Sequence, residues 1–110
     1  MSKYGNQTTV VNGRTFDSRA EARRYVVLLG MERLGVITDL RCQVPFVLAP
    51  AVHLRGAARK SPALRYFADF VYLCNGNVTI EDVKGKSTDV YKLKRHLMAV
   101  AGHHITEIRA

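Results

Sequence analysis

The sequence predicts an α/β fold in which one mixed sheet is flanked by two helices. Three observations support this class: a β-hairpin turns at Asn75-Gly76, a capped helical pattern lies on each side of it, and an extended segment follows each helix. The resulting order is helix, strand, hairpin, helix, strand. With 110 residues, the chain has room for one modest core. We therefore expect residues 1–110 to form a single domain, with residues 1–13 partly flexible.

The hairpin brings acidic residues together. Asn75-Gly76 suits a two-residue type I′ turn, because both central residues of that turn take positive φ. Counting outward from the turn places Asp69 opposite Asp82. Side chains alternate along a strand, so Lys84 shares the face of the two aspartates, whereas Glu81 points to the other face. Two carboxylates that face each other destabilise a sheet, so a compensating charge is expected.

Two readings of this cluster stay open. Asp69, Asp82 and Lys84 suit a site where a hard divalent cation such as Mg²⁺ is shared between carboxylates and a substrate phosphate. Alternatively, Lys84 forms only a structural salt bridge with the aspartates.

A first helix is predicted over residues 18–34, and Gly35 ends it. Ser18 and Glu21 have the spacing of a capping box. Glu21 also lies one turn before Tyr25 on the apolar stripe, so it is either a capping residue or a third acid that points at the hairpin cluster. The outward positions form a basic edge of Arg19, Arg23, Arg24 and Arg33.

Between this helix and the hairpin, residues 36–40 and 44–48 are predicted as two short extended pieces. Pro45 indicates an edge or a bulge, because proline cannot donate to a sheet ladder. Residues 50–62 have little apolar content and are predicted to be a mobile basic loop. Its basic side chains are Arg55, Arg59 and Lys60.

A second helix is predicted after the turn and N-cap at residues 85–88. Apolar residues recur at helical spacing, and we expect them to face the core, with Tyr91 and Lys94 on the remaining surface. Gly102 ends the helix, and residues 103–108 form a last strand. The expected core positions are Val90, Leu93, Leu97 and Val100.

Composition restricts the partners. The chain carries 17 Lys and Arg against 9 Asp and Glu, a net charge of +8 that favours an anionic polymer as partner. We expect no membrane association, because the basic residues have no broad apolar face beside them and no apolar run reaches the length of a membrane span. The amino terminus has no apolar segment typical of a signal peptide.

The cysteines and histidines do not predict a metal site. Cys42 and Cys74 lie far apart in apolar segments, so buried free thiols in a reducing compartment are expected. The four histidines lack the spacing of zinc ligands.

Several stretches carry a family resemblance: F-D-S-R-A-E-A-R-R-Y, Q-V-P-F, Y-F-A-D-F-V-Y, and the Asp82-Val83-Lys84 triplet. With the order of elements, they make residues 14–108 similar to the PD-(D/E)XK nuclease superfamily, and in particular to small phage-encoded nucleases. The residue before Asp69 is Ala68, where the superfamily's name has proline. The resemblance implies a restriction-endonuclease-like αβββαβ core.

The resemblance also implies roles. Asp69 and Asp82 would bind Mg²⁺, for which Mn²⁺ substitutes, Glu21 would complete the metal site, and Lys84 would orient or activate the attacking water. The positions of Tyr91 and Lys94 would approach the scissile phosphate. With them, the expected DNA-binding residues are Arg19, Arg23, Arg24, Arg55, Arg59, Lys60 and Lys86.

The function implied is a metal-dependent endonuclease that cuts branched DNA as a Holliday junction resolvase in phage recombination. Such a substrate requires two symmetric cuts and hence a homodimer, and the expected location is the cytoplasm of the host cell. A nicking, flap or single-strand endonuclease of phage DNA processing is the alternative within the same class. A nucleic-acid-binding module that does not cut is the alternative from another class.

Overall fold

A four-stranded sheet organises the chain, which is described here from a computed structural model over residues 7–109. In chain order the elements are β1 (Thr9–Val11), β2 (Arg14–Phe16), α1 (Arg19–Arg33), β3 (Thr38–Ala49), β4 (Leu64–Cys74), β5 (Asn77–Lys84), α2 (Asp89–Val100) and β6 (Ile105–Arg109).

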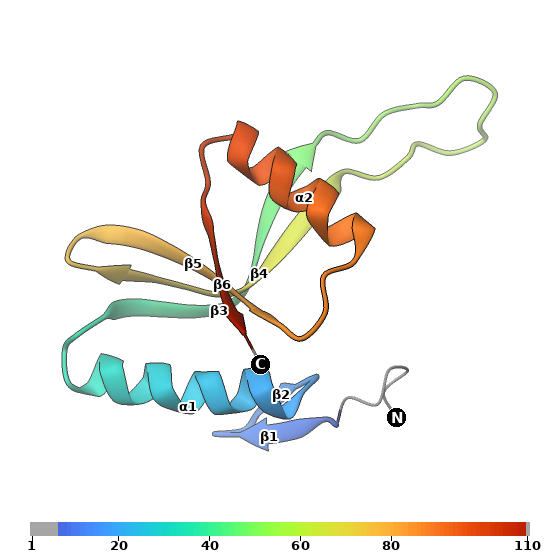
Figure 1. Cartoon of the computed structure of the whole chain (residues 1–110). Helices are drawn as coiled ribbons and strands as arrows, with labels where there is room; N and C mark the ends of the chain where they lie inside the picture. The colour runs from blue at the N-terminus through green and yellow to red at the C-terminus, as the bar shows by residue number, and fades with distance from the viewer. Residues whose placement is uncertain (1–6, 110) are drawn as a thin grey trace.

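The sheet is mixed and the two helices flank it. Its strand order is β3-β4-β5-β6, and β5 and β6 run parallel while the other neighbours are antiparallel. Helix α1 lies below the sheet and α2 above it in the view of Figure 1. The predicted α/β class and the predicted order of helices and strands are therefore confirmed. The small hairpin of β1 and β2 precedes them and packs against α1. Of the segment expected to be partly flexible, residues 1–6 lie outside the described residues.

Helix α1 begins where the sequence predicts. The Ser18 hydroxyl accepts a hydrogen bond from the Glu21 backbone N–H at 3.1 Å, which satisfies one of the free donors of the first turn. The helix packs its apolar side on the sheet through Tyr25, whose ring stacks on Phe70 with centroids 6.1 Å apart. Leu28 is fully buried beside them. No helix within residues 7–109 is long and apolar enough to cross a membrane.

The expectation of two short strands over residues 36–40 and 44–48 is wrong, because β3 is one strand of 12 residues. Asp39 and Gln43 take positive φ of 55° and 52°, and the register shifts between Thr38 and Arg41. These local irregularities bend the strand without ending it, because pairing with β4 continues on both sides of Gln43. Pro45 lies on an edge strand, as predicted.

The hairpin register is the predicted one, from the pair Cys74 and Asn77 out to Phe70 and Glu81. Asn75 and Gly76 take φ of 52° and 78°, as a type I′ turn requires. The ladder described for β4 and β5 ends at Phe70 and Glu81, one pair before the two aspartates.

Strand β4 serves two cores. Its residues Phe70 and Tyr72 belong to the cluster under α1, whereas Tyr66 and Ala68 belong to the cluster under α2. The change from one core to the other occurs around Asp69. The position where the strands separate is thus the boundary between the two cores.

The predicted core face of α2 is wrong. Val90, Leu93 and Val100 are 63, 61 and 75% exposed and Leu97 is half-buried, whereas the helix buries Tyr91 and Met98. The helix carries two stripes at helical spacing, and periodicity alone cannot select between them. Tyr91 decides the orientation, because its ring packs near Tyr66 and its hydroxyl donates to the Glu107 carboxylate at 2.7 Å.

The segment between β3 and β4, residues 50–63, forms an arm that extends away from the body of the molecule (Figure 1). A single pair of backbone hydrogen bonds, between Val52 and Ser61, ties its two sides together. The predicted basic loop is therefore a projecting arm, and the basic residues Arg55, Arg59 and Lys60 are all exposed on it.

Candidate active site

A cleft of about 400 Å³ opens where α1, β4, β5 and the start of α2 meet. The four residues predicted to be catalytic all line it: Glu21, Asp69, Asp82 and Lys84. Further lining comes from Gln43 and Tyr66, and from Tyr91 and Lys94 of α2. Local sequence features place these groups: the Ser18 cap fixes the start of α1, and the Asn75-Gly76 turn sets the register of β5.

Asp69 binds strand β5 through its side chain at the point where backbone pairing between β4 and β5 ends. One of its carboxylate oxygens, Oδ2, accepts a hydrogen bond from the Val83 backbone N–H at 2.8 Å. The other oxygen, Oδ1, accepts from the Gln43 side-chain amide at 3.2 Å. The Asp69 side chain thus binds the β5 backbone just beyond the last pair of the β4–β5 ladder. These two hydrogen bonds fix its carboxylate in the lining of the cleft.

Asp82 is 5% exposed and has two side-chain partners. The Tyr66 hydroxyl donates to its Oδ2 at 2.5 Å, and the Lys84 ammonium lies 3.1 Å from its Oδ1. Burial raises the pKa of Asp82, and the charge of Asp69 raises it further, while the hydrogen bonds from Tyr66 and Lys84 lower it. The two aspartates are therefore close enough to repel each other, as the hairpin register predicts.

Glu21 points into the cleft as a third acid. It is 7% exposed, and its carboxylate accepts from the same Gln43 amide that binds Asp69, at 3.0 Å. Burial raises the pKa of Glu21 to about 8, and the hydrogen bond and charge of Asp69 add to the shift. Of the two roles left open for this residue, the structure supports the acid that faces the hairpin cluster. The Ser18 hydroxyl supplies the N-cap of the helix.

Lys84 is held on two sides. Its ammonium pairs with Asp82, and it lies 3.7 Å from the centroid of the Tyr91 ring, a cation–π contact. The Tyr91 hydroxyl is in turn fixed by Glu107, which also pairs with Arg95. The salt bridge expected in the structural reading is present, and it keeps the ammonium inside the cleft.

The residues expected to bind DNA are not all at the cleft. Tyr91 and Lys94 line it, and Lys86 is exposed in the turn between β5 and α2. Arg24 instead binds Glu81 on the α1 side of the sheet, through two hydrogen bonds of 2.8 and 2.6 Å. Arg19 and Arg23 lie beside β1, where Arg19 bonds Gln7. The arm carries the remaining three, namely Arg55, Arg59 and Lys60.

Sequence reasoning left several lining residues of the cleft unassigned, among them Gln43, Tyr66 and Phe67. Gln43 joins Glu21 to Asp69, and Tyr66 binds Asp82. Their signal was present in the stretches Q-V-P-F and Y-F-A-D-F-V-Y, which point to the family resemblance but do not by themselves assign roles.

The donor chemistry of the cleft fits a hard cation that retains water. Within residues 7–109, no group of three or more His, Cys, Asp and Glu side chains is placed so that it could hold a metal ion. Asp69 and Asp82 nevertheless offer carboxylate oxygens in one cleft, and Glu21 lies near Asp69. Mg²⁺ takes one or two carboxylates and completes its shell with waters and substrate phosphates, so these residues suit that ion.

Comparison with known proteins gives one match. A family model described as a protein of unknown function (DUF1064) matches residues 1–108. No curated protein and no solved structure matches the chain.

Proposed function

We propose that this chain, which belongs to the DUF1064 family, is a metal-dependent endodeoxyribonuclease that hydrolyses phosphodiester bonds. The observation that carries the proposal is the convergence of Asp69, Asp82 and Lys84 in one cleft, with Glu21 beside them. Four acidic residues line this cleft in a protein with a net charge of +8, namely Asp17, Glu21, Asp69 and Asp82, and they indicate a local requirement for negative charge.

Asp69 and Asp82 would hold Mg²⁺, or Mn²⁺ in its place, with Glu21 completing the site. A divalent cation in that position supplies Lewis acidity and lowers the pKa of a bound water. The chain's own residues supply orientation: Val83 and Gln43 fix the Asp69 carboxylate, and Tyr66 fixes Asp82. These contacts reduce the reorganisation needed when substrate binds.

Lys84 provides a fixed positive charge at the reacting phosphate. Its ammonium is held between Asp82 and the Tyr91 ring, so its position is set before substrate arrives. A preorganised charge of this kind stabilises the negative charge that develops on phosphate oxygens during hydrolysis. Lys94 lines the cleft from the same side of α2 as Tyr91 and is partly buried there. It is suited to bind a neighbouring phosphate.

Branched DNA, with the four-way junction as the main case, is the substrate we propose. Phosphate contacts and DNA shape would govern selection, because the described fold is a small sheet flanked by two helices and its cleft offers charged groups for phosphates. Two symmetric cuts would require a homodimer. The role in phage recombination and the location in the host cytoplasm belong to the same proposal.

Asp82→Asn tests the catalytic assignment, because it keeps the side-chain shape and removes the charge. The substrates are a supercoiled plasmid, a synthetic four-way junction and a matched linear duplex, each with Mg²⁺, Mn²⁺ or EDTA. We expect wild-type cleavage with either metal and none in EDTA, and a loss of about 100-fold or more in Asp82→Asn, with DNA binding retained or strengthened.

Asp39→Asn is the matched control, because Asp39 is an exposed aspartate paired only with its neighbour Arg41. It should cut like wild type. Unchanged weak cleavage in Asp82→Asn would indicate a contaminating nuclease, and binding without any cleavage by wild type would leave the non-cutting module. Equal cutting of junction and linear duplex would overturn the junction preference in favour of a less selective nuclease.

A further inference from the structure

The two-stranded ribbon of β3 and β4 has one open face that leads to the cleft. Beyond the end of the β5 ladder, Pro45 pairs with Phe67 and Val47 pairs with Arg65. The alternating residues Phe46 and Tyr66 turn the other way and join the core under α2. The open face, defined by Pro45, Val47, Arg65 and Phe67, is exposed, with Phe67 at 50% and Val47 at 64%.

Phe67 is the aromatic residue of this face that also reaches the site. It lines the cleft together with Asp69, two residues further along the same strand and about 7 Å away along the backbone. Nothing in the proposed hydrolysis uses an exposed aromatic ring. A half-exposed phenyl group beside catalytic carboxylates is a surface on which a base can stack.

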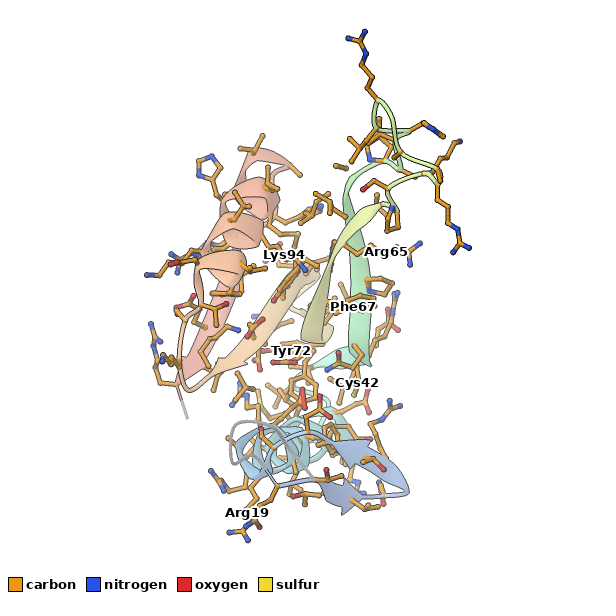
Figure 2. All side chains as sticks on the ribbon, turned by 90° about the vertical axis from the view of Figure 1, so that its right-hand side faces the viewer. Arg19, Cys42, Arg65, Phe67, Tyr72 and Lys94 are labelled. Atoms are coloured by element: carbon orange, nitrogen blue, oxygen red, sulfur yellow. The ribbon has the colours of Figure 1, made fainter. Side chains whose placement is uncertain are left out.

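Charge along the same ribbon points to a nucleic-acid strand. From residue 40 to residue 68 the sequence contains five basic residues and no acidic one; the basic residues are Arg41, Arg55, Arg59, Lys60 and Arg65. Arg65 lies on the open face, and the ribbon continues into the arm that carries three others. Figure 2 shows Phe67 and Arg65 following each other along the ribbon toward the arm. A basic track combined with an aromatic platform is typical of proteins that bind single strands.

From this arrangement we propose that the open face binds an unpaired DNA strand running between the cleft and the arm, with Phe67 stacking on a base next to the scissile phosphate. The strand must be unpaired there, because a duplex keeps its base faces stacked inside. A second copy of the chain fits this face poorly, since it would bring Arg65 and the basic arm against the same basic groups of the partner. The inference rests on the proposed nuclease function, and it adds that the branched substrate presents unpaired nucleotides at the cut, at an opened branch point.

Binding in EDTA tests this inference separately from cleavage. A single-stranded oligonucleotide carrying one fluorescent base analogue that is quenched by stacking is titrated with wild type, Phe67→Ala, Phe67→Leu and Phe67→Trp. A matched duplex is titrated in parallel. Because Phe67 is half-exposed, all variants should fold, which circular dichroism and thermal melting would verify. Val78→Ala is the control, since Val78 is exposed at 63% on β5 and does not line the cleft.

We expect Phe67→Ala and Phe67→Leu to lose about tenfold in single-strand affinity together with the quenching signal. Phe67→Trp and Val78→Ala should keep both, and duplex affinity should change little in any variant. Equal single-strand affinity of Phe67→Ala and wild type would overturn the inference, as would loss of duplex affinity to the same degree. Cleavage with Mg²⁺ is measured separately. If the wild-type protein cuts DNA but its single-strand affinity does not depend on Phe67, only this inference fails. If the wild-type protein cuts no DNA, the nuclease proposal fails.

Discussion

Glu81 is 1% exposed, and its charge is balanced by Arg24 of helix α1, which packs over it. Arg24 donates two hydrogen bonds to it, the Tyr72 hydroxyl donates a third, and the pKa of Arg24 is raised mainly by its bond to Glu81. Two parallel hydrogen bonds between a guanidinium and a carboxylate are among the stronger polar contacts in proteins. Arg24 therefore contributes to the stability of the fold beneath the cleft.

Arg24→Gln should lower the free energy of unfolding by about 3–5 kcal/mol, because it leaves the Glu81 carboxylate buried without its partner. Urea unfolding followed by circular dichroism measures this value. Arg41→Gln breaks an ion pair that is exposed on both sides, so we expect little change in the free energy of unfolding. Similar losses in both variants would contradict the assignment of Arg24 to the core.

The sequence could not separate Arg24 from its neighbours. Its spacing puts it on the same basic edge as Arg19 and Arg23, and Glu81 is 57 positions away along the chain. Local periodicity gives the side of a helix on which a residue lies, but not the group that meets it there. Glu21 was ambiguous for the same reason, because its role depends on how α1 packs on the sheet.

Helix α2 shows the same limit at the scale of an element. Its start and its end were predictable from Thr88 and Gly102, and the structure has the Thr88 side chain accepting from the Tyr91 backbone N–H. The side of the helix that faces the sheet could not be predicted, since two sets of residues at helical spacing were both suitable. The buried stripe contains Tyr91 and Met98, and Tyr91 adds to its apolar contacts a hydrogen bond to Glu107 that a hydrophobicity pattern does not count.

A pair of substitutions tests this orientation. Met98→Ala removes a fully buried side chain, so it should lower the free energy of unfolding by about 2–5 kcal/mol. Leu93→Ala truncates a side chain that is 61% exposed, and we expect a change within about 0.5 kcal/mol. Thermal and urea unfolding of the two variants give the comparison, and a larger loss for Leu93→Ala would mean that the helix is rotated toward the face first predicted.

The pairing register of two strands could be predicted from the sequence only where the connection between them is short. The two-residue turn fixes the register of β4 and β5, and this brought Asp69, Asp82 and Lys84 together correctly. The arm that joins β3 to β4 fixes no register, because a long connection permits many alignments. Gln43 and Phe67 are part of the cleft only through that pairing, so they could not be placed from the sequence.

At the scale of the whole molecule, charge is distributed unevenly. The cleft is lined by four acidic residues, whereas the arm and ribbon carry basic residues without acidic ones between residues 40 and 68. In the proposed function, one part of the surface would hold the phosphate backbone while another would concentrate a cation. It also predicts that DNA binding depends strongly on salt, since each phosphate contact releases counterions.

The contribution of the arm to phosphate binding can be measured from the salt dependence of DNA affinity. We expect the logarithm of the DNA association constant in EDTA to fall linearly with the logarithm of salt concentration, and Arg59→Ala to reduce the magnitude of that slope by roughly 0.7–0.9. Arg33→Ala removes an equally exposed charge at the far end of α1, so its slope should equal that of wild type. Equal slopes for wild type and Arg59→Ala would exclude the arm from phosphate contact.

Pro45 has a further effect on how molecules of this protein meet each other. Strand β3 is long and lies at the margin of the sheet, where free backbone groups invite another chain to add on as a neighbouring strand. The missing N–H of Pro45, together with the bends at Asp39 and Gln43, interrupts that row of donors and acceptors. The margin is thereby protected against aggregation, which lets the adjoining surface stay open without making the protein self-associate through its strands.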